Sequence, residues 1–523
     1  MKNALLIIIL ALVSAAHGYA QSNEDLSGGL VWESEPYMAT DPANPQHIVV
    51  AWMGSVPLSH LCIKIIATFN GGATWSSPAI IPHVSPTYTS ADVSMAFDHT
   101  GNIYTTYIDS RQSPDSGAVY VVKSADGGLT WGSPAQVISG FADGTKFPID
   151  RPWLTIGKST GPAPDTLYIT TKPAPFVAPP NRPYFEKSYD GGATWSAWRY
   201  IDTTGYLVGN VVQAPMAAPG TDSAGTFHCV YPSYLPSQSI YPQYIMATAR
   251  PGNTFSYNVV YTSIGASPID TLAKAGARFI CDPTNNKHLA LLHIEDLTGD
   301  LDVYCTETTD GGITWSPQAR VNDDASGNGK MQDLVWANFD ENGDLVAAWR
   351  DRRNAPGTGY QQPSQVWGTI KWKDSASFST NFMISDSTAP YDSIYLSGSG
   401  NDFMNVAMAQ DTLSAVWGDV RTGALNIWFS RRAMRTGVTV VKSIASEPVP
   451  AVNIYPDPSQ GHLTVEGSYI TGILITDLGG RAVFQKTISA EKTLLDLSFL
   501  TPGTYIASVN TANGVVSKQI EIK

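Results

Sequence analysis

Short apolar and aromatic runs, bounded by turn-forming residues, recur along most of this sequence. Residues 48–52 (IVVAW), 103–107 (IYTTY) and 119–123 (VYVVK) are examples. They are rich in the β-branched and aromatic side chains that favour strands. The 3.6-residue apolar spacing of an amphipathic helix is essentially absent. The pattern therefore predicts an all-β protein.

One turn-like motif follows such runs four times, at residues 124–131 (SADGGLTW), 188–195 (SYDGGATW), 308–315 (TTDGGITW) and, as a variant, 68–75 (TFNGGATW). The Gly-Gly pair supplies the positive φ of a tight turn, while Asp and Ser or Thr side chains bond turn N–H groups. The Trp is expected to bury its ring between neighbouring sheets. We expect a structural role for the turn residues Asn70, Trp75, Asp126, Trp131, Asp190, Trp195, Asp310 and Trp315.

The spacing of these motifs indicates a repeat. Their Asp or Asn positions (70, 126, 190 and 310) are separated by 56, 64 and 120 residues, the last being two steps of 60. Degenerate copies fall at 248–255, 373–378 and 430–432. With four short strands per unit, this period predicts a β-propeller. Seven inner strands are predicted, opening at Glu35, Asp92, Asp150, Gln213, Gly276, Asp333 and Asp402. Seven blades are favoured, and six remain an alternative.

The motifs resemble the Asp boxes, or BNR repeats, of the sialidase superfamily. The resemblance implies a propeller, but several features of true sialidases are missing. No Arg precedes Arg111, which lies beyond the first motif, and residues 33–36 (ESEP) stand where that family has Phe/Tyr-Arg-Ile-Pro. Seven repeats also differ from the six blades of sialidases. The chain is more similar to exported sialidase-like repeat proteins, so no catalytic residues are carried over.

Both ends of the chain carry export features. Residues 1–20 predict a signal peptide: Lys2 precedes an apolar run at 4–13, and Gly18-Tyr19-Ala20 forms a cleavage site. No later segment is predicted to span a membrane. The 523-residue chain has a net charge of −13, which argues against nucleic acid or anionic membranes as partners. Its four cysteines are too few for a disulfide framework and are expected to be buried thiols.

A Pro-rich linker at 446–452 separates the propeller (21–445) from a small C-terminal β-sandwich at 453–523. This segment contains 453–458 (NIYPDP), 473–481 (ILITDLGGR), 497–505 (LSFLTPGTY) and a terminal Lys523. It resembles the C-terminal sorting domain of the type IX secretion system, with Asp457 in place of the usual Asn. The resemblance implies a Bacteroidetes-type bacterium and a protein carried across the outer membrane by that machinery. Removal of the domain on surface attachment or release is also implied.

The candidate ligand-binding residues lie where the inner strands begin and the second strands end. They are Asp92, Arg111, Asp150, Arg151, Asp333, Arg352, Asp402 and Arg421. Converging carboxylates and guanidinium groups can bind an acidic or polyhydroxyl ligand. Ion pairs between adjacent blades are the structural alternative. Segments 98–102 and 340–344 are expected to be hairpin turns rather than calcium loops, and no metal or cofactor is predicted.

Two functions remain open. The first is a non-catalytic surface propeller that binds glycan or protein ligands. The alternative is a glycoside hydrolase of sialidase-like or other polysaccharide-active type that uses carboxylates at the propeller mouth. Two isolated carboxyls roughly 5–9.5 Å apart would favour hydrolysis. Acids that are each paired with an Arg of the next blade would instead favour a structural role.

Overall fold

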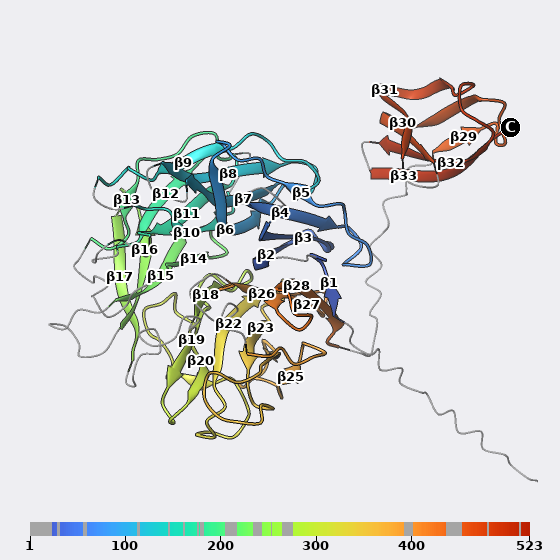
Figure 1. Ribbon diagram of the computed structural model, residues 1–523. Coiled ribbons are helices and arrows are strands. Elements are labelled where there is room, and N and C mark those ends of the chain that lie inside the picture. Colours follow the sequence, from blue (N-terminus) through green and yellow to red (C-terminus); the bar gives the residue numbers. More distant parts are fainter. Residues whose placement is uncertain are drawn as a thin grey trace, which may run out of the picture. The chain divides into compact units, whose positions relative to one another are not determined.

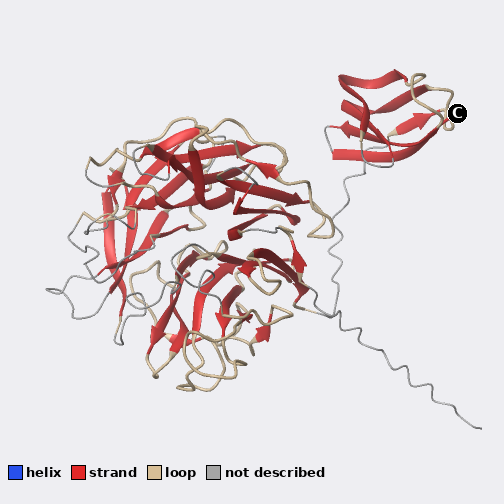
Figure 2. Cartoon of the chain, in the orientation of Figure 1, coloured by secondary structure: helices blue, strands red, loops and turns tan. Residues whose placement is uncertain are grey.

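We analysed a computed structural model of the chain. It divides into two compact units, residues 1–435 and 436–523. The structure describes residues 23–28, 32–55, 60–111, 116–144, 147–159, 163–174, 177, 182–203, 217–233, 243–252, 254–263, 276–391, 401–435, 452–477, 481–511 and 514–523. The predicted signal peptide, the inner-strand opening at Gln213 and linker residues 446–451 lie outside these ranges. Every regular element of the described residues is a strand (Figures 1 and 2).

The first unit contains seven four-stranded antiparallel sheets among its described residues. Blades 1 to 3 are β2 (Glu33–Asp41), β3 (Asn44–Ser55), β4 (Leu61–Thr68), β5 (Ala79–Ile80); β6 (Tyr88–Phe97), β7 (Ile103–Arg111), β8 (Gly117–Ser124), β9 (Ala135–Ser139); and β10 (Asp150–Gly157), β11 (Thr166–Lys172), β12 (Tyr184–Ser188), β13 (Arg199–Tyr200).

Blades 4 to 6 continue the same order from the inner to the outer strand. They are β14 (Ala218–Thr221), β15 (Phe227–Ser233), β16 (Gln243–Arg250), β17 (Thr254–Thr262); β18 (Ala277–Cys281), β19 (Leu289–Asp296), β20 (Leu301–Thr308), β21 (Ala319–Arg320); and β22 (Gln332–Phe339), β23 (Leu345–Asp351), β24 (Gln365–Lys371), β25 (Phe382–Met383). Blade 7 has β26 (Met404–Ala409), β27 (Thr412–Asp419) and β28 (Asn426–Ala433).

The ring closes through the N-terminal end of the propeller. Strand β1 (Glu24–Asp25) pairs with β28 as the outer strand of blade 7. The inner strands contact one another in the order β2, β6, β10, β14, β18, β22, β26 and back to β2. This arrangement confirms the predicted propeller and gives it seven blades. Strand β1 thus holds the outer position of blade 7, and residues 437–441, which follow that blade in the sequence, lie outside the described residues. Trp32 makes an isolated bridge to Leu425 of blade 7.

Aromatic rings fill the axis of the propeller. The ring centroid of Trp153 lies 5.8 Å from that of Tyr37, 5.4 Å from that of Trp336 and 4.9 Å from that of Phe403. These four residues come from blades 1, 3, 6 and 7, and all are buried. We call this group the aromatic plug. Because close-packed rings leave no room for solvent, the plug divides the axis into two halves.

The two ends of the propeller differ. We call the end where the inner strands begin the entry face. The inner strands end on the other side, which we call the turn face. Because each blade is an antiparallel meander, the repeated Gly-Gly turns after the third strands lie at the turn face.

The repeated turns are held by the hydrogen bonds that the motif predicts. Asp126 accepts hydrogen bonds from the Ser124 hydroxyl (2.7 Å) and from the amide and hydroxyl of Thr130 (2.9 and 2.5 Å). In another copy, the bonds from the side chain and backbone of Thr194 lower the pKa of Asp190 to about 2. The Trp rings were expected to be buried but are only partly so, because the turns lie at the edge of the sheets.

The second glycine of each motif lies against the preceding blade. A Cβ atom on Gly72 would lie 2.7 Å from the Phe429 ring of blade 7, and one on Gly128 would lie 3.1 Å from Val49 of blade 1. These glycines have φ of 90°. The motif therefore sets the distance between neighbouring blades as well as the turn.

The second unit is a separate all-β module, as predicted. It has five strands: β29 (Asn453–Tyr455), β30 (His462–Asp477), β31 (Ala482–Asp496), β32 (Gly503–Thr511) and β33 (Gly514–Ile522). All five join one curled antiparallel sheet, in which β30 pairs with β31 along one edge and with β29 and β32 along the other. Leu463, Ile475, Val509 and Ile520 are in its own apolar core.

We expect Gly72→Ala to reduce the free energy of unfolding of the propeller by roughly 2–4 kcal/mol. About 1–2 kcal/mol would come from the left-handed backbone, and the rest from the clash with the Phe429 ring. Gly311→Ala is the matched control, because Gly311 has φ of 78° but no atom within 4 Å of an added Cβ. Denaturant unfolding of both variants measures the difference. Equal losses would contradict a spacing role for the second glycine.

Candidate functional site

A β-bulge starts the inner strand in four blades, on the entry face. The residue at the bulge has positive φ in each case: Glu35 (54°), Asp92 (54°), Arg151 (50°) and Leu334 (53°). The predicted blade openings are therefore not equivalent. Asp150 and Asp333 lie one position before the bulge residue, whereas Glu35 and Asp92 occupy it. Because a bulge adds one residue to only one strand, its position could not be read from the apolar pattern.

Four of the eight predicted residues come together at the axis on the entry face. The Arg151 guanidinium forms an ion pair with Asp402, with 2.6 Å between Nη2 and Oδ2, and so joins blade 3 to blade 7. The Arg151 backbone amide donates to Asp92 at 3.0 Å. Asp150 forms an ion pair with Lys172. The side chains of Asp150, Arg151 and Asp402 are 14%, 14% and 15% exposed, so each keeps some surface open to a ligand.

Asp92 and Asp150 form a hydrogen-bonded carboxyl pair with opposite pKa shifts. Burial and the neighbouring charge of Asp150 raise the pKa of Asp92 to about 6. Burial also acts on Asp150, but the charges of Lys172 and Arg151 outweigh it and lower the pKa of Asp150. Like charges in contact cannot both ionise freely, so the proton stays with the carboxyl that has no cation of its own. The pair therefore carries close to one negative charge below about pH 6, and Asp92 ionises as the pH rises through that value.

Asp333 and Arg352, two further predicted residues, are buried in blade 6. Asp333 accepts hydrogen bonds from Arg350 Nε (2.7 Å), Arg352 Nη1 (3.0 Å) and the Tyr360 hydroxyl (2.6 Å). Burial would raise the pKa of Asp333, but the two arginines outweigh it and lower that pKa. Both the Asp333 and Arg352 side chains are 0% exposed. They offer no surface to a ligand, so the expectation that Arg352 contacts one was wrong.

An Asp-x-Arg sequence follows the second strand in three blades, at 109–111 (DSR), 351–353 (DRR) and 419–421 (DVR). In two of them the Arg forms a clamp with the Asp of its own blade. Arg421 pairs with Asp419 of its own blade (2.6 Å) and contacts Asp386 in the preceding loop. Its guanidinium lies 4.3 Å from the centre of the Trp428 ring. In blade 6 the equivalent arginine is Arg353, not Arg352; it pairs with Asp351 at 2.9 Å. Because two arginines stand side by side at 352–353, the sequence did not show which of them pairs with Asp351. The two-residue spacing between Asp and Arg would have favoured Arg353.

The third copy of this repeat differs. Asp109 is buried and accepts hydrogen bonds from His83, the Val84 amide and Ser90. Arg111 ends β7 and is exposed. The structural alternative, an Asp of one blade paired with an Arg of the next, also occurs in these motifs. Arg353 and Arg421 each pair with an acid of their own blade and with one in the loop after the preceding blade, Asp323 and Asp386. Arg151–Asp402 instead connects blades that are not neighbours.

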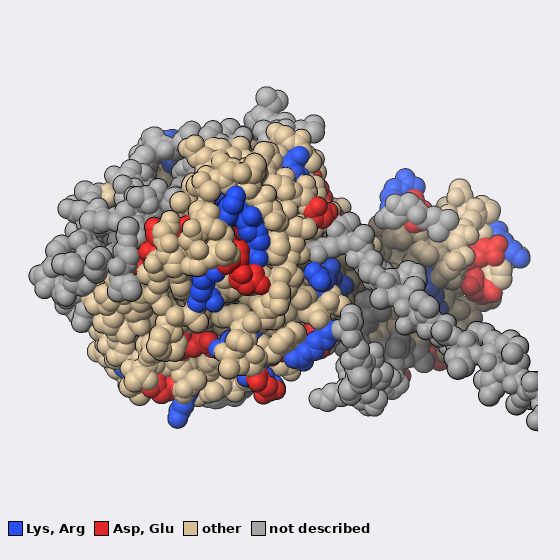
Figure 3. All heavy atoms as spheres, turned by 90° about the horizontal axis from the view of Figure 1, so that it is seen from below, with Lys and Arg blue, Asp and Glu red and all other residues tan. Residues whose placement is uncertain are grey.

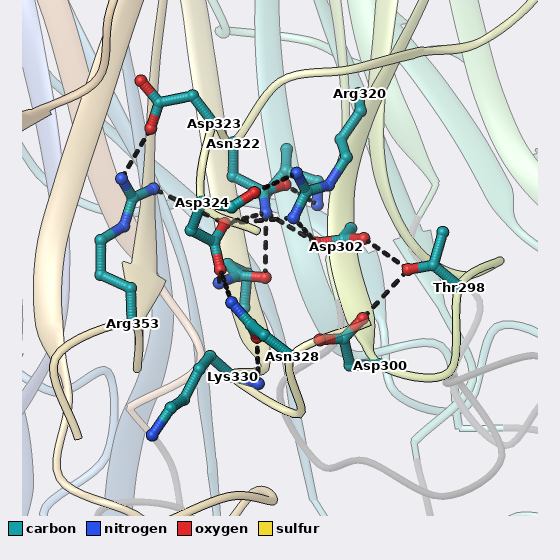
Figure 4. Close-up of polar contacts among 12 residues, drawn as sticks. Thr298, Asp300, Asp302, Arg320, Asn322, Asp323, Asp324, Asn328, Lys330 and Arg353 are labelled. Atoms are coloured by element: carbon teal, nitrogen blue, oxygen red, sulfur yellow. Dashed lines mark hydrogen bonds and ion pairs between the residues drawn. The ribbon is translucent and has the colours of Figure 1, made fainter. Parts of the chain in front are cut away.

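A larger polar network joins blades 5 and 6 beside the Arg353 clamp (Figure 4). Asn322 donates to Asp302 (2.6 Å), Asp324 (2.7 Å) and Gln332 (3.1 Å). Arg320 contacts Asp302 and Asp324, and Arg353 reaches Asp323 at 2.7 Å. Because these acids have partners within the network, we assign it a structural role.

Charges of both signs are intermixed on the propeller side seen in Figure 3.

Within the described residues, no group of three or more His, Cys, Asp or Glu side chains could hold a metal ion. The sequence also has two Pro-rich, aromatic segments, 172–184 and 231–244, and much of both lies outside the described ranges. Within those ranges, no helix is long and apolar enough to cross a membrane. All four cysteines are free, and Cys281 is the one that is only partly buried.

Comparisons with known proteins identify the C-terminal unit. The family model of the secretion system C-terminal sorting domain matches residues 453–523. The protein is therefore secreted across the outer membrane, to the cell surface or the extracellular space. A search of curated proteins found no match.

Solved structures with a similar chain course include a protein of unknown function from Dyadobacter fermentans (TM-score 0.41, 14% identity, covering 66% of this chain and 98% of that one). Another is the NanB sialidase of Streptococcus pneumoniae (TM-score 0.36, 12% identity, covering 79% of this chain and 69% of that one). A third is an α-L-arabinanase of Penicillium chrysogenum complexed with arabinobiose (TM-score 0.42, 10% identity, covering 80% of this chain and 98% of that one). At these values they carry no argument about function.

We expect a double-mutant cycle on Arg151→Gln and Asp402→Asn to give a coupling energy of about 1–3 kcal/mol, because both side chains are largely buried. The free energy of unfolding of the two single variants and the double variant measures it. The exposed pair Arg435–Asp411, with side chains 51% and 38% exposed, is the control and should show little coupling. Equal coupling in both pairs would contradict a special role of the axial pair.

Proposed function

We propose that the protein is an exported propeller that binds glycan or protein ligands at the axis of its entry face, without hydrolysing them. The observation that carries this proposal is the ion-paired cluster formed by Asp150, Arg151, Lys172 and Asp402. Its carboxylates and guanidinium group are fixed in place and still partly exposed. Preorganised charged groups of this kind bind polar ligands at a low cost in side-chain entropy.

The pairing of the acids favours binding over hydrolysis. A hydrolytic pair needs one carboxyl as acid and another as base or nucleophile, about 5–9.5 Å apart. Asp402 is instead neutralised by Arg151, Asp150 is neutralised by Lys172, and Asp92 is in hydrogen-bond contact with Asp150. None of these three carboxyls is isolated, because each is in contact with a cation or another carboxyl.

Hydrolysis remains a second candidate because of Asp92. A carboxyl with a pKa of about 6 is partly protonated near neutral pH and could donate a proton to a leaving group. A glycoside hydrolase would need its nucleophile or base elsewhere on the entry face. Loss of glycan turnover in Asp92→Asn, with the variant still folded, would support this function.

We expect the full chain to bind a subset of ligands on a glycan array, and Arg151→Gln to weaken that binding about tenfold. Removal of one charged hydrogen-bond partner has an effect of this size. Arg250→Gln is a control, because it removes one exposed positive charge from blade 4, away from the axis. A fluorogenic sialoside should be hydrolysed little or not at all. Robust turnover, or binding that is insensitive to Arg151, would contradict the proposal.

We expect a chain truncated after Ser446 to fold and to remain in the periplasm of the native host. The propeller has its own core and closes through β1 and β28, while the sorting domain carries the export address. Cell fractionation and a melting curve test both parts. If the truncated chain still reached the cell surface, the C-terminal unit would not be required for sorting.

A further inference from the structure

A second cavity system lies on the other side of the aromatic plug. One cavity of about 280 Å³ is formed by the ends of the inner strands and reaches Tyr37, a member of the plug. An adjoining cavity of about 320 Å³ shares Thr40, Pro42, Asn338 and Ala407 with it. Pro42 and Asn338 are exposed, so the system opens to solvent at the turn face. Its combined size is in the range of small-molecule sites.

Arg278 gives the inner cavity its charge. Its guanidinium lies over the Trp336 ring, 4.4 Å from the centre, and is 6.0 Å from the centre of the Trp153 ring. No carboxylate of the described residues forms an ion pair with it, and its buried Nε has no hydrogen-bond acceptor. Among the described residues that line the two cavities, Arg278 is the one basic side chain. This contrasts with Arg151, which is paired with Asp402.

An amide group lies in the same cavity. Asn405 is 4% exposed, and its side chain makes no hydrogen bond with any described residue. Because it lines the cavity, the Asn405 amide can offer both a hydrogen-bond donor and an acceptor to a polar ligand group. The exposed Asn338 adds a second amide at the cavity mouth.

The acids in this system lie only in the outer cavity and are engaged in local contacts. Asp41 accepts from the Ala43 amide and contacts His47, and Asp340 accepts the amides of its own turn. Glu341 accepts the Gln410 amide. One cation deep inside and three acids near the mouth favour a ligand with a single negative charge and disfavour a polyanion.

We propose that the turn-face half of the axis binds a small hydroxylated monocarboxylate. Its carboxylate accepts hydrogen bonds from Arg278, and its hydroxyl groups exchange hydrogen bonds with Asn405 and Asn338. The guanidinium fork suits a carboxylate, and its stacking on Trp336 holds it in one orientation. This site is separate from the entry-face cluster, because the aromatic plug lies between them.

Isothermal titration of the full chain with sodium D-glucuronate tests the proposal. We expect saturable binding of glucuronate and at least tenfold weaker binding of D-glucose, which has no carboxylate. Arg278→Gln should weaken glucuronate binding at least tenfold, and Asn405→Ala should also weaken it. Arg250→Gln and Arg151→Gln should leave it unchanged, since neither residue lines the cavities. Melting curves establish whether each variant is folded. If Arg278→Gln does not fold, Asn405→Ala is the variant that tests the site.

Three results would overturn the proposal. The first is the absence of saturable glucuronate binding by the wild-type chain. The second is equal affinity for glucose and glucuronate. The third is glucuronate binding that depends on Arg151 but persists in the folded Arg278 or Asn405 variant, which would place the ligand at the entry face instead.

Discussion

The packing of Tyr37, Trp153, Trp336 and Phe403 at the axis is the interaction on which the rest of the propeller depends. Seven sheets in a ring leave a central channel, because their inner strands contact only their neighbours. Rings from blades 1, 3, 6 and 7 fill it and connect blades that are far apart in the ring. Buried aromatic area of this kind is a large apolar contribution to stability.

Closure of the ring and the spacing of its blades depend on different interactions. Closure depends on two residues of β1, which add the outer strand to blade 7 and so join the two ends of the propeller chain. Spacing depends on the repeated turns, where glycines at positive φ allow one blade to approach the next. The Asp hydrogen bonds hold the turn, whereas the missing side chain of the second glycine determines how closely the blades pack. One short motif thus serves both local and tertiary structure.

The number of blades and the chemistry of the turns could be predicted from the sequence, because both follow from a motif that repeats with a nearly fixed period. It did not reveal the bulges at Asp92 and Arg151, since one extra residue in a strand leaves the apolar composition unchanged. It also could not separate Arg352 from Arg353. Both follow Asp351, the last residue of β23, but Arg352 contacts the buried Asp333 whereas Arg353 pairs with Asp351. Burial of a charged side chain is a property of tertiary packing, and an isolated motif does not encode it.

The two arginines on either side of the plug show how the same residue type is stabilised in different ways. Arg151 has Asp402 as a counter-ion, so its charge is compensated within the protein. Arg278 has no ion-pair partner among the described residues and lies over the Trp336 ring and near the Trp153 ring. Cation–π contacts of this kind return part of the solvation that a partly buried guanidinium loses. Leu or Met at position 278 would fill the same space without that cost. An arginine in a solvent-connected cavity, beside an amide with no partner, is therefore better explained by a ligand than by packing.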